Sequence, residues 1–210
     1  AQTFSTVGFG SYHPDNNLTN IVSVLEMLVG MMYLALAAGL LFARFSRPVS
    51  KIIYSNKLLV APYKNGKGLM FRLANAKNNL LLNVTIRVFL TMKVEIQGRM
   101  ERKFFQLPLE MNHIDFLALS WTVVHPLDEK SPLYGMKPDD LKASDAEFII
   151  MLNGTNDTFS QSIQSRTSYK YFDMIWDARF KKIFSSKNGT TKVNVDAIGA
   201  YEKINGSQVK

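Results

Sequence analysis

The feature that most constrains this chain is a long apolar stretch near its N-terminus. Residues 27–43 carry no charged side chain, and residues 18–43 carry only Glu26. About 20 apolar residues in a helix span the hydrocarbon core of a bilayer, which is about 30 Å thick. The remaining chain has the pattern of β-strands and could not surround so long a helix in a soluble fold. We therefore expect a transmembrane helix here.

Positive charge is confined to the part of the chain that follows this stretch. All 25 Lys and Arg residues lie at or beyond Arg44, and the formal net charge is +8. Basic residues collect on the cytoplasmic side of membrane helices, so we expect the C-terminal end of the helix to face the cytoplasm. Cys is absent from the 210 residues, which suits a reducing compartment and excludes thiolate chemistry and a disulfide framework.

A short glycine-spaced segment precedes the apolar stretch and consists of Thr6, Val7, Gly8, Phe9 and Gly10. Because glycine reaches positive φ at no steric cost, such a segment can turn its carbonyl groups to one side. Four copies around an axis would stack rings of carbonyl oxygens that replace the water shell of K⁺. The segment resembles the potassium-channel selectivity filter, with Phe9 where Tyr is commoner. The pattern alone leaves open a glycine-rich turn without a ligand.

The arrangement of filter and helix predicts a fourfold assembly. Non-helical backbone at membrane depth is tolerated only where protein buries it, and one chain cannot do so; we therefore expect a homotetramer that conducts K⁺. One stripe of the helix is expected to line the pore: Glu26, Gly30, Leu34, Ala38 and Phe42. Four Phe42 rings would form a hydrophobic gate at the inner mouth; a lipid-facing Phe42 and a structural role for Glu26 behind the filter are the alternatives.

From residue 58 onward the hydrophobic period changes to two, which is typical of strands. Apolar side chains occupy every second position from Leu82 to Ile96. Asn65-Gly66 and Asn188-Gly189 predict tight turns, and a short helix is expected to start at Pro138. Further strands are expected at 68–75, 103–109, 116–125, 147–153, 160–169 and 175–184. Many short strands with little helix predict an immunoglobulin-like β-sandwich.

Several motifs resemble those of inwardly rectifying potassium channels, most closely the prokaryotic members. Arg44-Phe45-Ser46-Arg47-Pro48 resembles the junction that follows the inner helix. Three further motifs occupy residues 125–135, 164–169 and 175–180, and Tyr12-His13-Pro14 follows the filter segment. The resemblance runs from about residue 4 to residue 195. It implies a homotetramer with a transmembrane pore and a cytoplasmic vestibule that continues the ion path.

The resemblance also assigns a second constriction and a lipid site. The loop of residues 154–161 falls on the family's cytoplasmic constriction, with Gly154, Thr155, Ser160 and Gln161 as its expected residues. Strongly rectifying members carry acidic residues where Leu34 and Asn153 stand here, so we expect only weak block by Mg²⁺ or polyamines. The basic cluster of Arg44, Arg47, Lys51 and Lys57 is expected to bind anionic lipid head groups; simple anchoring without regulation is the alternative.

The expected architecture is thus a membrane α part followed by an all-β part, in a protein of the cell membrane. Residues 1–48 would form the C-terminal part of a potassium-channel pore module, and 49–57 a linker. Residues 58–200 would form the cytoplasmic sandwich, and 201–210 a tail. We expect a first membrane helix, an interfacial helix and most of the pore helix upstream of Ala1.

Three rival functions find little support in the sequence. An enzyme is disfavoured because His13, His113 and His125 lack metal-ligand spacing and the acidic pair Asp128-Glu129 lies in a proline-bounded loop. A single-pass protein displaying an immunoglobulin-like binding module would place its sandwich on the opposite, outer side of the membrane. Nucleic-acid binding is disfavoured because the basic residues are spread among the strands.

Overall fold

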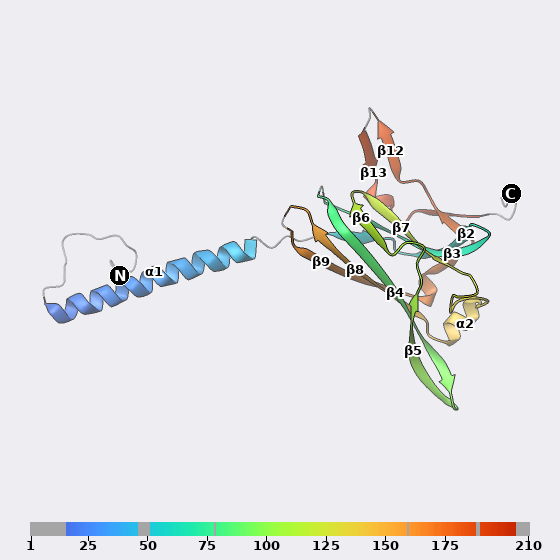
Figure 1. Ribbon diagram of the computed structural model, residues 1–210, viewed down its shortest axis with the longest axis horizontal. Coiled ribbons are helices and arrows are strands. Elements are labelled where there is room, and N and C mark those ends of the chain that lie inside the picture. Colours follow the sequence, from blue (N-terminus) through green and yellow to red (C-terminus); the bar gives the residue numbers. More distant parts are fainter. Residues whose placement is uncertain (1–15, 46–50, 78, 159, 188–189, 205–210) are drawn as a thin grey trace. The chain divides into compact units, whose positions relative to one another are not determined.

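The computed structural model describes residues 16–45, 51–77, 79–158, 160–187 and 190–204 (Figure 1). The chain forms two compact units, residues 1–49 and residues 50–210. The first unit contains one long helix and the second contains the strands, so each is described by itself.

Helix α1 (Asn17–Phe45) contains the whole of the expected membrane stretch. Asn16 caps its start, because the Asn16 side-chain oxygen accepts a hydrogen bond from the backbone N–H of Thr19 at 2.9 Å. Arg44 lies in the last turn, where the carbonyl end of a helix favours a cation. The most apolar 18-residue window of α1 has a mean hydropathy of 2.1, so the helix is long and apolar enough to cross a membrane.

The second unit is built on two five-stranded sheets. In the first sheet, β1 (Ile52–Tyr54) and β2 (Leu58–Tyr63) pair with one edge of β3 (Gly66–Asn75), and β7 (Ser120–Pro126) pairs with its other edge. The strand β10 (Met174–Trp176) pairs with β2 in parallel. The second sheet has the order β5 (Arg99–Leu107), β4 (Leu81–Ile96), β8 (Glu147–Asn156) and β9 (Ser162–Lys170), with β6 (His113–Leu117) beside β4.

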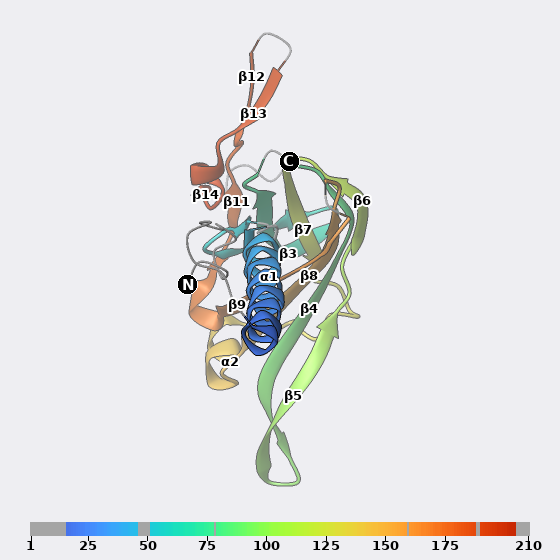
Figure 2. The same ribbon diagram turned by 90° about the vertical axis from the view of Figure 1, so that its left-hand side faces the viewer.

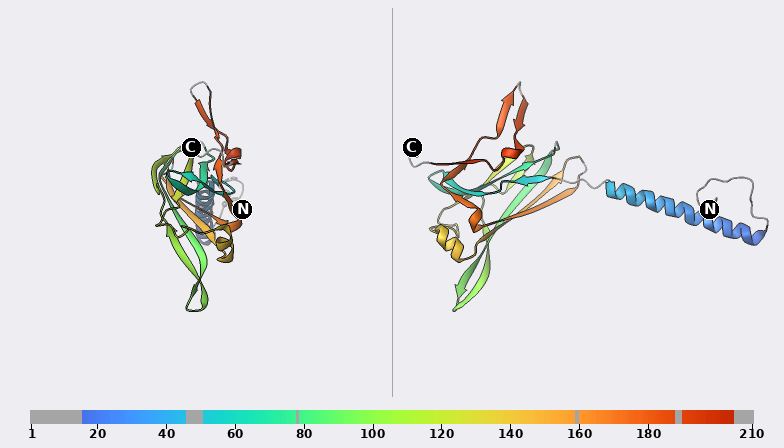
Figure 3. Two further views of the ribbon diagram at one scale, coloured as in Figure 1. Left: turned by 90° about the vertical axis from the view of Figure 1, so that its right-hand side faces the viewer. Right: turned by 180° about the vertical axis from the view of Figure 1, so that it is seen from behind.

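Smaller elements surround these sheets. Two short antiparallel pairs join β11 (Ala178–Phe180) to β14 (Tyr201–Lys203) and β12 (Phe184–Lys187) to β13 (Thr190–Val193). The helix α2 (Pro138–Ala143) precedes β8, as Pro138 predicted, and two 3₁₀ turns, η1 and η2, cover Tyr171–Asp173 and Val195–Ala197. The β4–β5 and β12–β13 hairpins project from opposite sides of the sandwich (Figures 1 and 2), and α2 lies at the end away from the β8–β9 turn (Figure 3).

The two large sheets face each other across one hydrophobic core, which confirms the sandwich. The first sheet contributes buried side chains such as Val60, Phe71 and Leu73, and the second contributes Ile86 and Phe148. The Phe71 ring also meets the Tyr169 ring across the core, with 6.3 Å between centroids. Inward-facing residues from both sheets interdigitate in this way in β-sandwiches.

The alternation expected along β4 holds from Val84 to Leu90 but fails at its start, and Thr91 is buried as well. Leu81 is fully buried and Leu82 is only half-buried, although the sequence pattern placed Leu82 on the apolar face. A bulge between Leu82 and Thr85 shifts the register, and Asn83 adopts a positive φ of 50° there. The extra residue of a bulge exchanges the two faces of a strand.

Two of the expected strands are broken, and four strands were not expected. The range 116–125 is divided between β6 and β7, and the range 175–184 between β10, β11 and the first residue of β12. Asp177, with φ at 51°, separates β10 from β11. The unexpected strands are β1, β2, β13 and β14. Strands therefore begin at Ile52 and extend to Lys203, inside the ranges expected for the linker and the tail.

The sequence predicted two tight turns between strands. The turn predicted at Asn65-Gly66 is present, but Tyr63 pairs with Gly66, so Lys64 and Asn65 are its loop residues. The turn predicted at Asn188-Gly189 lies outside the described residues.

Candidate ion pathway

Part of the predicted pathway falls beyond the described residues. This part comprises the filter residues 6–10 and Arg47 of the basic cluster. Helix α1, the residues that follow it from Lys51, and the β8–β9 turn apart from residue 159 are described.

The predicted pore stripe winds slowly around α1, because each four-residue step turns about 40° beyond one full helical turn. Its members are spaced by four residues and cover about 24 Å of the helix axis. Gly30 is buried and Glu26 half-buried, whereas Leu34, Ala38 and Phe42 are exposed, Phe42 to 74%. Only 6% of the most apolar window of α1 is buried within the chain. So large an apolar surface needs lipid or other protein around it.

The members of the basic cluster differ in whether their charged groups already have a partner. Arg44 and Lys51 are exposed, and the Lys51 backbone carbonyl accepts a hydrogen bond from the Ala76 N–H at 2.9 Å. The Lys57 ammonium instead forms an ion pair with Asp173, with 2.6 Å between Nζ and Oδ1. Both of these side chains are half-buried, so Lys57 is already committed to a partner inside the sandwich.

The predicted constriction residues fall on a strand end and a turn. Gly154 and Thr155 belong to β8, whereas Ser160 and Gln161 lie in the turn before β9. A Cβ at Gly154 would lie 3.3 Å from a methyl carbon of Val84, so the close approach of β4 at its bulge favours glycine. The Asn156 N–H donates to the Gln161 carbonyl at 2.9 Å and closes the turn.

The turn also contains an acidic residue that the sequence interpretation overlooked. Asp157 is exposed, and its backbone N–H donates to the Leu80 carbonyl at 3.2 Å. Its side-chain Oδ1 accepts a hydrogen bond from the Thr158 hydroxyl at 3.0 Å. This carboxylate is the group of the turn best able to attract a cation.

A pair of tyrosines joins the start of the sandwich to β9. The Tyr54 hydroxyl donates to Ser165 Oγ at 3.0 Å, and the Tyr169 hydroxyl donates to the Ser55 backbone carbonyl at 2.6 Å. We call Tyr54, Ser55, Ser165 and Tyr169 the tyrosine clamp. Burial raises the pKa of Tyr54, and it raises the pKa of Tyr169 to about 12. Both phenols are therefore neutral hydrogen-bond donors near pH 7. The sequence carried no signal for this pairing.

Comparison with known protein families identifies the chain. The family model described as the inward rectifier potassium channel C-terminal domain matches residues 52–209, and a model described as an ion channel matches residues 1–47. The chain belongs to the inward rectifier potassium channel family. Members of this family are ion channels, not enzymes, in agreement with the sequence interpretation.

Individual inward rectifiers resemble the chain over most of its length. The inward rectifier potassium channel Kirbac3.1 of Paramagnetospirillum magnetotacticum is 33% identical over 88% of this chain and 63% of its own length. The human ATP-sensitive inward rectifier potassium channel 8 is 28% identical over 95% of this chain and 49% of its own length. The chain thus spans between about half and two thirds of these relatives.

In this inward rectifier chain, the histidine of the motif at 125–135 has a structural place. His125 is 2% exposed; its Nδ1–H donates to the Pro108 carbonyl, and its Nε2 accepts from the Ser131 hydroxyl at 2.7 Å. Burial lowers the pKa of His125. The exposed His113 contacts Thr85 through Nδ1 at 3.1 Å. The described residues contain no group of three His, Cys, Asp or Glu side chains that could hold a metal.

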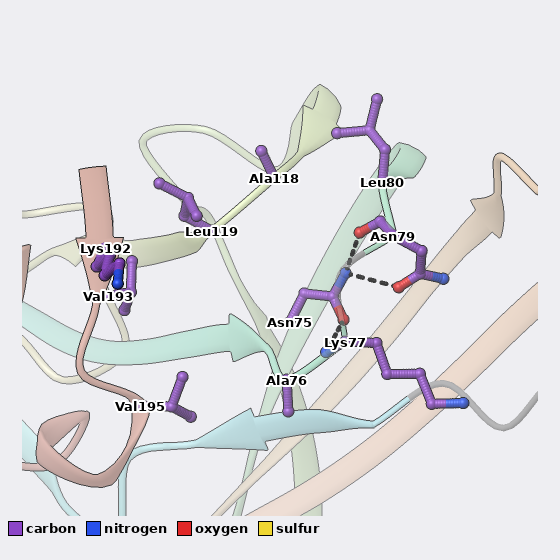
Figure 4. Close-up of a pocket in the computed structure, with 10 residues that line it drawn as sticks. All are labelled: Asn75, Ala76, Lys77, Asn79, Leu80, Ala118, Leu119, Lys192, Val193 and Val195. Carbon is purple, nitrogen blue, oxygen red and sulfur yellow. Dashed lines mark hydrogen bonds between the residues drawn. The ribbon is translucent and has the colours of Figure 1, made fainter. Parts of the chain in front are cut away.

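A pocket of about 540 Å³ lies at the β3–β4 loop (Figure 4). The Asn75 side-chain amide donates to the Asn79 carbonyl at 2.6 Å and shapes the loop. Lys77 and Lys192 lie on opposite sides of the pocket in Figure 4, so their ammonium groups do not converge on one anion. We therefore assign this pocket no part in the ion pathway.

Proposed function

We propose that the full-length protein is a homotetrameric channel that passes K⁺ down its electrochemical gradient. The observation that carries this proposal is the glycine-spaced segment at 6–10, placed directly before an exposed apolar helix in a member of the inward rectifier family. Four copies are needed because one chain can neither close a ring of carbonyls nor bury a pore loop. Uptake of K⁺ into proteoliposomes that contain the purified channel tests the proposal, and absence of uptake would contradict it.

In the proposed filter, backbone carbonyls take the place of water around the ion. The carbonyls of Thr6, Val7, Gly8 and Phe9 would supply these oxygens, and the Thr6 hydroxyl would add a ring at the inner end. Several weak sites in line let one ion displace the next. Conduction is then passive and selective without a tight site.

The channel would stand in the cell membrane with the sandwich in the cytoplasm. Support comes from the charge pattern, since all basic residues lie at or beyond Arg44. Arg44, Arg47 and Lys51 would meet anionic lipid head groups at the inner surface. We leave Lys57 out of this site because Asp173 already neutralises it.

The inner end of α1 would carry the gate. Four Phe42 rings in a fourfold bundle would close the pore by excluding water, and their large exposed area in the single chain agrees with a partner of this kind. The residues 154–161 of the β8–β9 turn would form a second constriction in the cytoplasmic vestibule. Since neither Leu34 nor Asn153 is acidic, Mg²⁺ and polyamines would block the channel only weakly.

Replacing the gate residue tests this part of the proposal. Phe42→Ala should raise the single-channel open probability, because a methyl group leaves the inner mouth wide enough to stay hydrated. Phe45→Ala is the matched control: Phe45 lies on the same helix and is 82% exposed, but it is not part of the pore stripe. Equal effects of the two substitutions, or no effect of Phe42→Ala, would contradict the gate assignment.

A further inference from the structure

Three contacts join the first residues of the sandwich to β9 and the turn after it. Two are the crossed hydrogen bonds of the tyrosine clamp, from Tyr54 to Ser165 and from Tyr169 back to Ser55. The third is the ion pair between Lys57 and Asp173, and Asp173 also accepts the Lys170 N–H at 3.1 Å. The segment 54–57 is thus tied at three points to the segment 165–173.

These contacts connect edge strands of the two sheets. In the first sheet β1 is the end strand next to β3, and in the second sheet β9 is the end strand next to β8. An edge strand has a neighbour on one side only, so its position depends more than that of a central strand on side-chain contacts. The clamp therefore joins the edges of the two sheets through side-chain contacts.

Each end of the clamp is close to one of the proposed gates along the chain. Residues 46–53 alone separate Tyr54 from Phe45, the last residue of α1. Ser165 lies in β9 about 13 Å from Gln161, the last residue of the β8–β9 turn, at the usual rise per strand residue. A displacement of the linker therefore has a short, side-chain-bonded route to the constriction.

The interior of the clamp is sheltered from water. Tyr169 is 4% exposed and packs against Phe71, and Tyr54 and Ser165 are half-buried. A buried hydroxyl that loses its partner is not compensated by solvent. The clamp therefore favours one relative position of β1 and β9 over a range of loosely bonded ones.

We propose that Tyr54 and Tyr169 are positioning residues that couple the linker after α1 to the β8–β9 constriction, so that the two gates of the channel respond together. This inference rests on the proposed channel function. It adds to that function the residues through which a conformational change at one gate would reach the other. Neither tyrosine touches the ion.

The test measures whether the constriction still responds when the inner gate is opened. A fluorophore is attached to Ser162→Cys, at the exposed first residue of β9 beside the proposed constriction, since these 210 residues contain no Cys. In the reconstituted full-length channel, Phe42→Ala should shift its emission. Adding Tyr54→Phe or Tyr169→Phe should abolish that shift while Phe42→Ala still raises K⁺ conduction.

A matched control removes the hydroxyl group of a tyrosine next to the clamp. Tyr171 follows Tyr169 by two positions and packs against Phe172, and its hydroxyl makes no hydrogen bond within the described ranges. Tyr171→Phe should therefore preserve the emission shift. A purely structural role of the clamp would lower the melting temperature of the channel and leave the shift in place.

A second measurement is independent of the Phe42 assignment. Tyr54→Phe and Ser165→Ala should each change the open-to-closed ratio of single channels by about three- to tenfold, the usual effect of one neutral hydrogen bond. The double variant should change it no further, because both remove the same bond.

Retention of the emission shift in both clamp variants would overturn the inference, as would unchanged open-to-closed ratios. If Phe42→Ala leaves conduction unchanged, the gate assignment fails by itself, and the open-to-closed ratios decide the clamp. If the channel passes no K⁺, the proposed function fails, and the coupling falls with it.

Discussion

At the scale of single residues, His125 links the stability of the sandwich to pH. Burial lowers its pKa below the ordinary value of 6.5, so the unfolded chain takes up a proton more readily than the folded one. The stabilising contribution of neutral His125 is therefore complete above pH 6.5 and is lost as the pH falls through the lowered pKa of the folded state. Protonation would also deprive the Ser131 hydroxyl of its acceptor, Nε2.

We predict that the melting temperature of the channel falls between pH 7.5 and pH 5.5, and that His125→Gln makes this fall smaller. At pH 7.5 the substitution itself should cost about 1 kcal/mol, since it replaces a buried, hydrogen-bonded ring. His113→Gln removes an imidazole at an exposed position of β6 and serves as the control for the substitution itself. Equal pH dependence in the wild type and the His125 variant would contradict this role.

At the scale of elements, the β8–β9 turn would determine how strongly the proposed pore attracts polyvalent cations. Asn153 is half-buried and pairs with Gln164 on β9. Both side chains are neutral amides, so neither residue contributes a carboxylate next to the turn. Asp157 is the acidic side chain within the turn. We expect the weak block by internal polyamines to depend on Asp157.

Recording with internal spermine tests this expectation. Block should be weak in the wild type and weaker in Asp157→Asn, and it should strengthen clearly in Asn153→Glu, because four added carboxylates would surround the ion path. Gln106→Glu adds the same charge on β5 and serves as the control. Strong block of the wild-type channel, or an equal effect of the two glutamates, would count against the proposed constriction.

Elements with a local signal were predictable, whereas those held by distant partners were not. The α1 stretch and the alternation of β4 depend on neighbours in sequence, so their hydrophobic period reveals them. The three residues of β14 are held by antiparallel pairing with β11, and β1 by pairing with the end of β3. Strands this short have too few residues to display a period.

The same distinction applies to the pathway. The filter segment, the pore stripe and the basic cluster are continuous or regularly spaced in sequence, so they could be proposed from it. The partners in the tyrosine clamp are separated by 111 and 114 positions, and the Asp173 partner of Lys57 by 116. Only the fold brings them together, which is why the sequence alone groups Lys57 with the lipid-binding residues.

At the scale of the whole molecule, the two units differ in how much apolar surface they leave exposed. The helical unit has an apolar surface that one chain leaves uncovered, whereas the sandwich buries its own core. The helical unit is therefore the one that most needs lipid or other protein around it. In the proposed channel, four helices would enclose the pore and the sandwiches would extend the ion path.

The central claim is that four glycine-spaced segments replace the water around K⁺ and discriminate against the smaller Na⁺. Its most direct test is cation flux into proteoliposomes that contain the purified full-length channel, with K⁺ or Na⁺ as the only permeant cation. We predict uptake of K⁺ with little uptake of Na⁺, and loss of this preference in Gly8→Asp. Equal uptake of K⁺ and Na⁺ by the wild-type channel would contradict the account.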